Sequence, residues 1–94
     1  MPPLAQPAID NLIQQLEGWQ QFDRIIGKTY RFKDYYQTIA FVNAIAWLSH
    51  HENHHPDLTV AYDNCRVEYT THAVHGLSEN DFICAAKVDA LFNL

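Results

Sequence analysis

The feature that most constrains this chain is an apolar stretch near its middle. Within residues 38–48 only Thr38 and Asn43 are polar, so one face of a helix cannot account for all of this apolar surface. A helix that is apolar nearly all round is buried on more than one side, and this stretch is too short to cross the roughly 30 Å of hydrocarbon in a bilayer. In a chain of 94 residues, we therefore expect another subunit to provide the second covering surface.

The limits of this helix follow from capping signals. Asp34 is a good N-cap, with Gln37 three residues later. Pro56 disfavours the helical conformation in the residue before it, His55. We therefore expect a helix over residues 34–54, through which the protein forms a homodimer or homotetramer.

Shorter patterns on both sides of this helix predict the remaining elements. They are a helix over 9–16 that Gly18 ends, strands at 19–22 and 28–32 separated by a segment containing Gly27, a hairpin of 58–62 and 65–71, and a last helix capped by Ser78 with Asp81 at its third position. The predicted order is αββαββα. It indicates an α+β fold in which one four-stranded antiparallel sheet has three helices packed on one face. A chain of this length supports a single domain over residues 1–94.

The register of the predicted hairpin brings two histidines together. We expect its turn at residues 63–64, which places Val60 opposite Val67, apolar against apolar. Continued past the strands, this register places His55 opposite His72, with Cβ atoms about 4.5–5.5 Å apart. The end of the long helix and the end of the last strand are therefore expected to meet around one small site.

The charge and the cysteines exclude several classes of protein. Eleven Asp and Glu residues against six Lys and Arg residues give a net charge of −5, whereas nucleic-acid and anionic-membrane surfaces need clustered positive charge. We expect no direct nucleic-acid partner and no membrane partner. Cys65 and Cys84 form no C-x-x-C pair, and the N-terminus shows no secretory signal. Free thiols in the cytoplasm are therefore expected.

The histidines gather in two short segments of the sequence. Histidine titrates near neutral pH, so a cluster of them is a candidate for proton transfer or metal binding. For any single histidine at the end of the helix, the favourable interaction of a protonated imidazole with the helix C-terminus, about 0.3–1 kcal/mol, is enough to explain its presence there. The cluster comprises His50, His51, His54 and His55 at the end of the long helix, and His72 and His75 after the last strand.

A metal site is the natural competitor of proton transfer. His50 and His54, like His51 and His55, are four residues apart, the spacing that places two imidazoles on one side of a helix. The acid Glu52, however, lies between the wrong histidines for an H-E-x-x-H motif, and no third ligand is specified. We expect no metal.

The histidines also belong to a longer pattern that resembles the signature of the pterin-4a-carbinolamine dehydratases. The resemblance covers nearly the whole chain and implies dehydration of 4a-hydroxytetrahydropterin to quinonoid dihydropterin, which regenerates the cofactor of aromatic amino-acid hydroxylases. It implies no metal and no cofactor. The matching residues are His54-His55-Pro56, Tyr62, His72 and Asp81 at fixed spacing, together with Trp19 and Gly76-Leu77-Ser78.

The resemblance implies a role for each site residue. His54 and His72 would be the catalytic acid/base pair, in an order that the sequence leaves open, and His55 would position the pterin. Two interpretations of Trp19 are equally open: it lies beside the pterin, as the resemblance implies, or it is an aromatic residue of the core. The remaining implied residues are Thr70 and Thr71, which would offer backbone or hydroxyl hydrogen bonds to the ring, and Asp81, which would orient His72 from behind or act only as a helix cap.

Two departures and one alternative accompany this resemblance. His50 stands where the family commonly has an acidic side chain, and Leu58 where an aromatic residue is frequent. Some members of the family serve as dimerisation cofactors of a homeodomain transcription factor, binding it through the apolar helix. The alternative is therefore a non-catalytic module that binds a partner helix, although His54, His55 and His72 are all retained.

Overall fold

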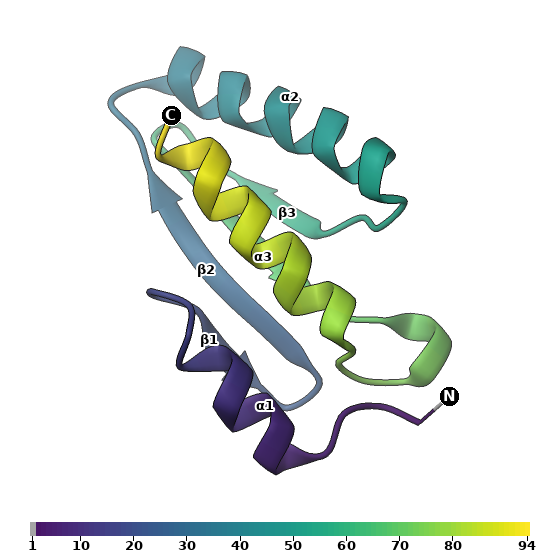
Figure 1. The fold of residues 1–94 in the computed structure, drawn as a ribbon. Helices are drawn as coiled ribbons and strands as arrows, with labels where there is room; N and C mark the ends of the chain where they lie inside the picture. The colour runs from purple at the N-terminus through teal and green to yellow at the C-terminus, as the bar shows by residue number, and fades with distance from the viewer. Residues whose placement is uncertain (1) are drawn as a thin grey trace.

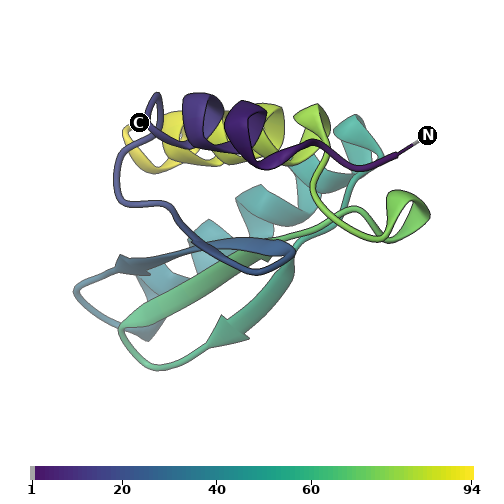
Figure 2. The same cartoon turned by 90° about the horizontal axis from the view of Figure 1, so that it is seen from below.

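A four-stranded antiparallel sheet carries three helices on one of its faces (Figures 1 and 2). The structure is a computed structural model that describes residues 2–94. Its elements are α1 (Gln6–Ile13), β1 (Gln20–Phe22), β2 (Ile25–Arg31), α2 (Tyr35–Glu52), β3 (Asp57–Val60), β4 (Asn64–Tyr69), the short 3-10 helix η1 (His72–Val74) and α3 (Glu79–Phe92). The strands lie in the order β1-β2-β4-β3. The predicted α+β fold and its αββαββα order are confirmed, and η1 is an addition before α3.

The core lies between the covered face of the sheet and helices α2 and α3. Every second residue of β4 is buried, because successive side chains of a strand point to opposite faces. The core includes Cys65, Val67 and Tyr69 of β4, Phe41, Ile45 and Leu48 of α2, and Phe82, Ala85 and Val88 of α3. These contacts use one side of α2 only.

Two predicted boundaries in the first third of the chain are wrong. α1 ends at Ile13 and does not continue to Gly18. Gly27 lies inside β2, and the turn before that strand contains Asp23 in the left-handed conformation, with φ 56°. A Cβ atom on Gly27 would lie 2.6 Å from Nη2 of Arg66. The glycine therefore allows the arginine side chain to cross the strand closely.

Helix α2 begins as predicted and ends two residues early, at Glu52. The Asp34 side chain accepts a hydrogen bond from the Gln37 backbone N–H at 2.9 Å, and the Gln37 side chain accepts one from the Lys33 backbone N–H at 3.0 Å. These two bonds satisfy backbone donors that would otherwise lie free at the start of the helix. No helix within residues 2–94 combines the length and the apolar character needed to cross a membrane.

The predicted register of the β3–β4 hairpin is wrong by two residues. Leu58, and not Val60, lies opposite Val67, and Val60 lies opposite Cys65. A shift of two residues keeps every side chain on its predicted face. Because β3 begins only at Asp57, the ladder does not extend to His55, and the predicted opposition of His55 and His72 is not seen.

Contacts with the rest of the fold hold the hairpin turn in its observed place. The backbone N–H of Phe32 donates to the carbonyl of Asp63 at 2.7 Å. The hydroxyl of Thr38 donates to the carbonyl of Tyr62 at 3.0 Å. These two bonds fix the turn at residues 62–63, whereas the sequence pattern alone suggested residues 63–64.

Both cysteines are expected to be unreactive in the folded protein. Cys65 and Cys84 are unpaired and buried, and burial raises the pKa of the Cys84 thiol to about 11 and that of the Cys65 thiol above its usual value. Since the thiolate is the reactive form, we expect no reaction with Ellman's reagent at pH 7 until denaturant is added, when both thiols react. One thiol per chain reacting natively at the rate of free cysteine would contradict this burial.

Candidate functional site

The turn that ends α2 determines where His54 lies. Asn53 adopts the left-handed conformation, with φ 53°, which asparagine tolerates better than most residues. The N–H of His54 donates to the carbonyl of Ser49 at 3.1 Å, and that of Asn53 donates to the carbonyl of His50 at 3.3 Å. These are the two bonds of a Schellman motif. His54 therefore leaves the helix in a fixed direction, toward the start of α3.

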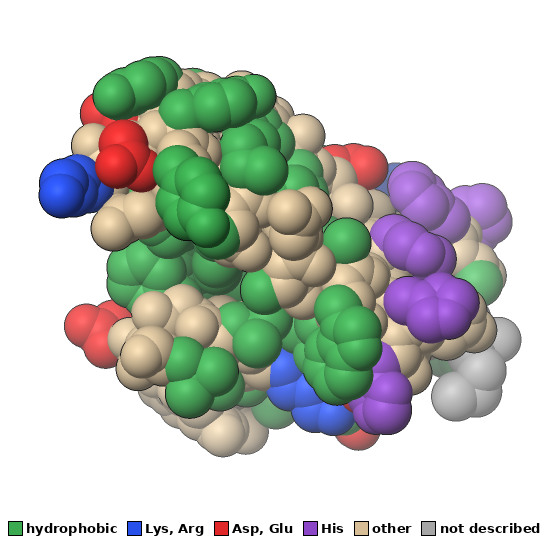
Figure 3. All heavy atoms as spheres, turned by 90° about the horizontal axis from the view of Figure 1, so that it is seen from above, with side chains coloured by type: hydrophobic (Ala, Val, Ile, Leu, Met, Phe, Trp, Pro, Cys, Tyr) green, Lys and Arg blue, Asp and Glu red, His purple; other side chains and the backbone are tan. Residues whose placement is uncertain are grey.

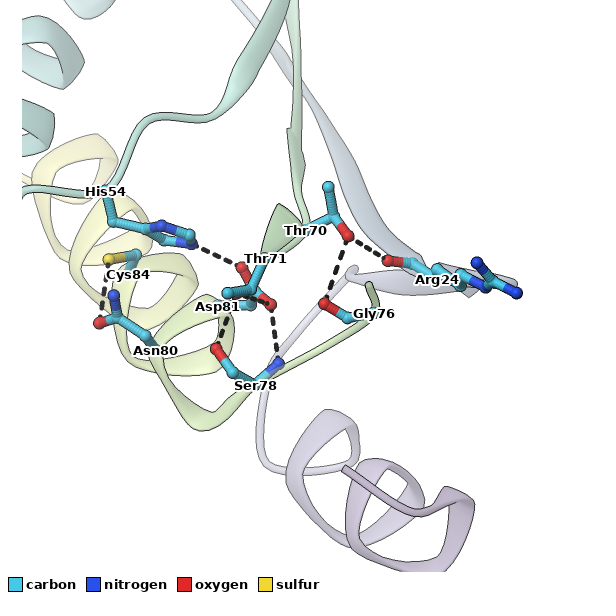
Figure 4. Close-up of polar contacts among 9 residues, drawn as sticks. All are labelled: Arg24, His54, Thr70, Thr71, Gly76, Ser78, Asn80, Asp81 and Cys84. Carbon is cyan, nitrogen blue, oxygen red and sulfur yellow. Dashed lines mark hydrogen bonds and ion pairs between the residues drawn. The ribbon is translucent and has the colours of Figure 1, made fainter. Parts of the chain in front are cut away.

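The His54 imidazole contacts a buried carboxylate. Its Nε2 lies 2.6 Å from Oδ1 of Asp81, which has no solvent exposure, and the imidazole itself is 13 % exposed (Figure 4). An ionised carboxylate can only accept hydrogen bonds, so Nε2 carries the proton in this contact. In the neutral ring, the lone pair is then on Nδ1. The contact thus fixes the tautomer of the neutral His54 ring, as the aspartate of a Ser-His-Asp triad does for its histidine.

Three segments of the chain donate to Asp81. Its Oδ2 accepts from the Thr71 hydroxyl at 2.8 Å and from the Ser78 backbone N–H at 2.9 Å (Figure 4). Asp81 and Ser78 also form the predicted capping box of α3. A buried charge is costly unless it is hydrogen-bonded, and here donors from the end of α2, the end of β4 and the start of α3 fulfil that need.

Tyr69 holds the His54 ring from its face. The two rings stack with centroids 5.3 Å apart and an interplanar angle of 19°. Tyr69 is buried, and burial raises the pKa of its phenol, so this group stays neutral at physiological pH. Tyr69 is not among the predicted site residues, although its position at the buried end of an alternating strand is a usable signal in the sequence. Asn53 is not among them either, and its signal is an asparagine directly after a helix.

The other predicted catalytic histidines lie at the surface of the same end of the molecule. His55 follows His54, and His72 begins η1; both side chains are exposed. Figure 3 shows histidine side chains gathered at one end of the molecule. Among residues 2–94, no hydrogen bond joins Asp81 to His72. The turn at Asn53 brings His54 to this carboxylate instead, and the orientation of His72 by Asp81 stays a prediction.

The predicted substrate-binding residues are engaged within the protein. Trp19 is 5 % exposed and donates its indole N–H to Asp89 at 3.1 Å, so it lies in the core, as the alternative interpretation has it. Thr70 donates its hydroxyl to the carbonyl of Arg24 at 2.6 Å (Figure 4). The Thr71 hydroxyl is bonded to Asp81. The indole N–H and the two hydroxyls therefore hold the fold together.

The histidine spacing does not produce a metal site of the predicted geometry. Since α2 ends at Glu52, His54 and His55 do not continue the helical face that carries His50 and His51. Within the described residues 2–94, no group of three or more His, Cys, Asp or Glu side chains is arranged to hold a metal ion.

Comparisons with known proteins show which sequences and folds this chain is similar to. A sequence model of the family described as "Pterin 4 alpha carbinolamine dehydratase" matches residues 2–91. A protein of Nitrosospira multiformis is 63 % identical over 94 residues, covering 100 % of this chain and 83 % of the relative. One of Nitrosomonas europaea is 66 % identical over 93 residues, covering 98 % and 82 %. Both carry the name "Putative pterin-4-alpha-carbinolamine dehydratase".

Two solved structures are similar to the fold. The "transcriptional coactivator/pterin dehydratase" of Brucella melitensis has a TM-score of 0.90 and 27 % identity, covering 95 % of this chain and 97 % of its own. A "pterin dehydratase-like protein", identified as a RuBisCO assembly factor in the alpha-carboxysome, has a TM-score of 0.65 and 28 % identity, covering 78 % and 84 %.

The Asp81 contacts make a specific prediction about stability. Asp81→Ala removes the acceptor for three donors, and each buried donor left without a partner costs about 1–3 kcal/mol. We therefore expect the free energy of unfolding, measured by urea denaturation, to fall by about 3 kcal/mol or more.

Glu79→Ala is the matched control. Glu79 is an exposed acid in the same first turn of α3, so its loss removes only a helix-dipole interaction of about 0.3–1 kcal/mol. Equal losses in the free energy of unfolding for the two substitutions would show that the Asp81 hydrogen bonds add no stability beyond the helix-dipole interaction.

Proposed function

The chain belongs to the pterin-4a-carbinolamine dehydratase family, and from this membership we propose that it dehydrates 4a-hydroxytetrahydropterin to quinonoid dihydropterin. The single observation that carries the proposal is the contact of His54 with the buried carboxylate of Asp81. A histidine fixed in this way is equipped for proton transfer near neutral pH. The pathway that we propose is the recycling of tetrahydrobiopterin or a related pterin for aromatic amino-acid hydroxylation.

The chemistry requires two proton transfers. The bond from C4a to its hydroxyl oxygen breaks, this oxygen gains a proton, and water leaves. The proton on N5 is removed, and the electron pair that it leaves forms the double bond between N5 and C4a. Substrate and product differ only by one water molecule, so no electrons are exchanged with another molecule, and we propose that the reaction uses no cofactor.

We assign the two transfers to His54 and His72. The lone pair on Nδ1 of His54 makes this residue the base for the N5 proton, since Asp81 stabilises the imidazolium that forms. His72, which is exposed, is free to approach the leaving hydroxyl as the acid. His55, exposed beside them, binds and positions the pterin ring.

The remaining predicted residues support the site from behind. Because the Thr70 and Thr71 hydroxyls are already bonded within the protein, we propose that they shape the loop that carries His72. Trp19 packs against Tyr69, with ring centroids 6.3 Å apart, and Tyr69 in turn packs against His54. Trp19 thus acts on the pterin site through Tyr69.

We also propose that the active form is a homodimer or homotetramer assembled through α2. One side of this helix packs in the core, whereas Tyr36 and Trp47 on the other side are 83 % and 66 % exposed. A partner helix from another protein could cover the same face, which is the alternative function as a dimerisation cofactor. The presence of the His54–Asp81 pair favours catalysis. We further propose one domain over residues 1–94 and a cytoplasmic location, which suits two unpaired thiols.

The proposed roles predict large kinetic effects. His54→Ala and His72→Ala should each lower kcat by about 10²- to 10⁴-fold, the usual contribution of a general acid or base. Stopped-flow absorbance with enzymatically generated 4a-hydroxytetrahydropterin measures this rate against the uncatalysed rate in buffer.

His75→Asn is the matched control for these variants. His75 is exposed in the same loop, and its φ of 56° is one that asparagine tolerates, so its rate should equal that of the wild type. If wild type and His72→Ala both react no faster than buffer, the enzyme proposal fails.

The proposed assembly predicts the size of the protein in solution. Sedimentation velocity at micromolar concentration should show a dimer or a tetramer, because the exposed aromatic residues of α2 are otherwise left in water. Trp47→Glu places a charge on this face and should yield a monomer. A wild-type protein that sediments as a stable monomer would contradict the proposed assembly.

A further inference from the structure

A cavity of about 580 Å³ lies where three distant segments of the chain meet. Its volume is within the roughly 300–1,000 Å³ that is usual for small-molecule sites. None of the three proposed catalytic histidines lines it, so it is separate from the proposed pterin site. The lining residues come from 3–9 at the start of the chain, 21–24 around the turn between β1 and β2, and 74–77 at the end of η1 and after it.

Close contacts between these segments form the walls of the cavity. The Thr70 hydroxyl donates to the carbonyl of Arg24 at 2.6 Å and lies 3.4 Å from the carbonyl of Gly76, on the side of Thr70 away from His54 (Figure 4). A Cβ atom on Gly76 would lie 2.9 Å from Cβ of Pro3, so the glycine allows the first segment to approach this loop. The walls are therefore in place before a ligand binds, which lowers the entropic cost of binding.

The turn between β1 and β2 places two opposite charges side by side at the rim. Asp23 adopts the left-handed conformation, with φ 56°, which aspartate tolerates better than most residues. Its carbonyl accepts a hydrogen bond from the Gln21 side chain at 2.9 Å. The Gln21 side chain also bonds to that of Gln6 at 2.7 and 3.1 Å. The turn that carries Asp23 and Arg24 is thus tied to the start of α1.

Neither of these charges has a partner within the described part of the chain. Asp23 and Arg24 are both exposed, and no ion pair among residues 2–94 involves either side chain. A ligand with only a negative charge would meet the repulsion of Asp23, and one with only a positive charge would meet that of Arg24. The rim therefore favours a ligand that carries both charges on neighbouring atoms.

The floor of the cavity is apolar. Ile9 and Leu77 are 6 % and 2 % exposed and belong to the core. Leu4 packs against the same core, and its backbone N–H donates to the carbonyl of Leu77 at 2.9 Å. Val74 adds a further apolar side chain. Burial of an apolar ligand group against this floor is favourable, whereas a polar group would lose its hydrogen bonds to water.

We propose that this cavity binds a free α-amino acid with a large apolar side chain. Its carboxylate bonds to the guanidinium of Arg24, which can offer two parallel N–H donors. Its ammonium group donates to the carboxylate of Asp23, and its side chain lies on the apolar floor. The inference goes beyond the proposed function, and the binding does not depend on dehydratase activity.

Titration of the full chain with L-phenylalanine, followed by ¹H–¹⁵N NMR, tests the site. We expect a dissociation constant of about 1 mM, which is typical of a ligand of this size. 3-Phenylpropionate lacks the ammonium group and 2-phenylethylamine lacks the carboxylate. Each should bind about tenfold more weakly, because one charge of the rim then has no partner. The amide signals expected to shift saturably are those of Leu4, Arg24, Gly76 and Leu77.

Two substitutions at exposed positions each remove one charge of the rim. Asp23→Asn keeps a residue that tolerates the left-handed conformation, and Arg24→Gln shortens a side chain with no partner among residues 2–94. Each should weaken the binding of L-phenylalanine about tenfold. Arg31→Gln is the matched control, because Arg31 is an exposed arginine at the end of β2 that does not line the cavity. This variant should bind as tightly as the wild type.

Three results would each overturn the proposal. The first is the lack of a saturable shift at these amides up to about 10 mM L-phenylalanine, ten times the expected dissociation constant. The second is equal affinity for L-phenylalanine and for either analogue, which would show that only the apolar group is recognised. The third is unchanged affinity in both Asp23→Asn and Arg24→Gln. The dehydratase assay has no part in these measurements, so failure here is not confused with failure of the proposed function.

Discussion

The position of the site depends on one buried carboxylate. Asp81 is removed from water, and its charge is tolerable only because His54, Thr71 and Ser78 donate to it. These donors come from the end of α2, the end of β4 and the start of α3. Three elements therefore have to meet at Asp81 before its burial is favourable. The contact that fixes the tautomer of His54 is thus also a contact on which the fold depends.

A second carboxylate on α3 also accepts hydrogen bonds from separate segments of the chain, near the other end of that helix. Asp89 accepts hydrogen bonds from Trp19, Lys28 and the Tyr30 hydroxyl, which belong to β2 and to the segment before β1. Burial of the apolar residues between the two aspartates, such as Ala85, is favourable but does not fix the orientation of α3. The hydrogen bonds of the two aspartates, near the two ends of this helix, fix that orientation. Through Trp19 and Tyr69, the contacts at Asp89 also support the ring of His54.

Local signals predicted the elements well, and long-range contacts explain where they failed. Asp34 and Gln37 determine the start of α2 through neighbours in sequence, and this boundary was correct. The hairpin register was wrong because Val67 meets an apolar partner in either arrangement, Val60 or Leu58. The choice depends on bonds from Phe32 and Thr38 to the turn, which connect residues far apart in the chain. The partner of Asp81 likewise depends on the left-handed turn at Asn53.

The last turn of α2 connects the proposed interface to the proposed site. Trp47 faces outward, whereas the carbonyl of Ser49, two residues later, accepts the N–H of His54. Packing of a second copy against Trp47 would restrict the motion of this turn, and so the position from which His54 reaches Asp81. Association also stabilises the native state by mass action. A chain of 94 residues can therefore gain part of the rigidity that its site needs from a neighbouring subunit.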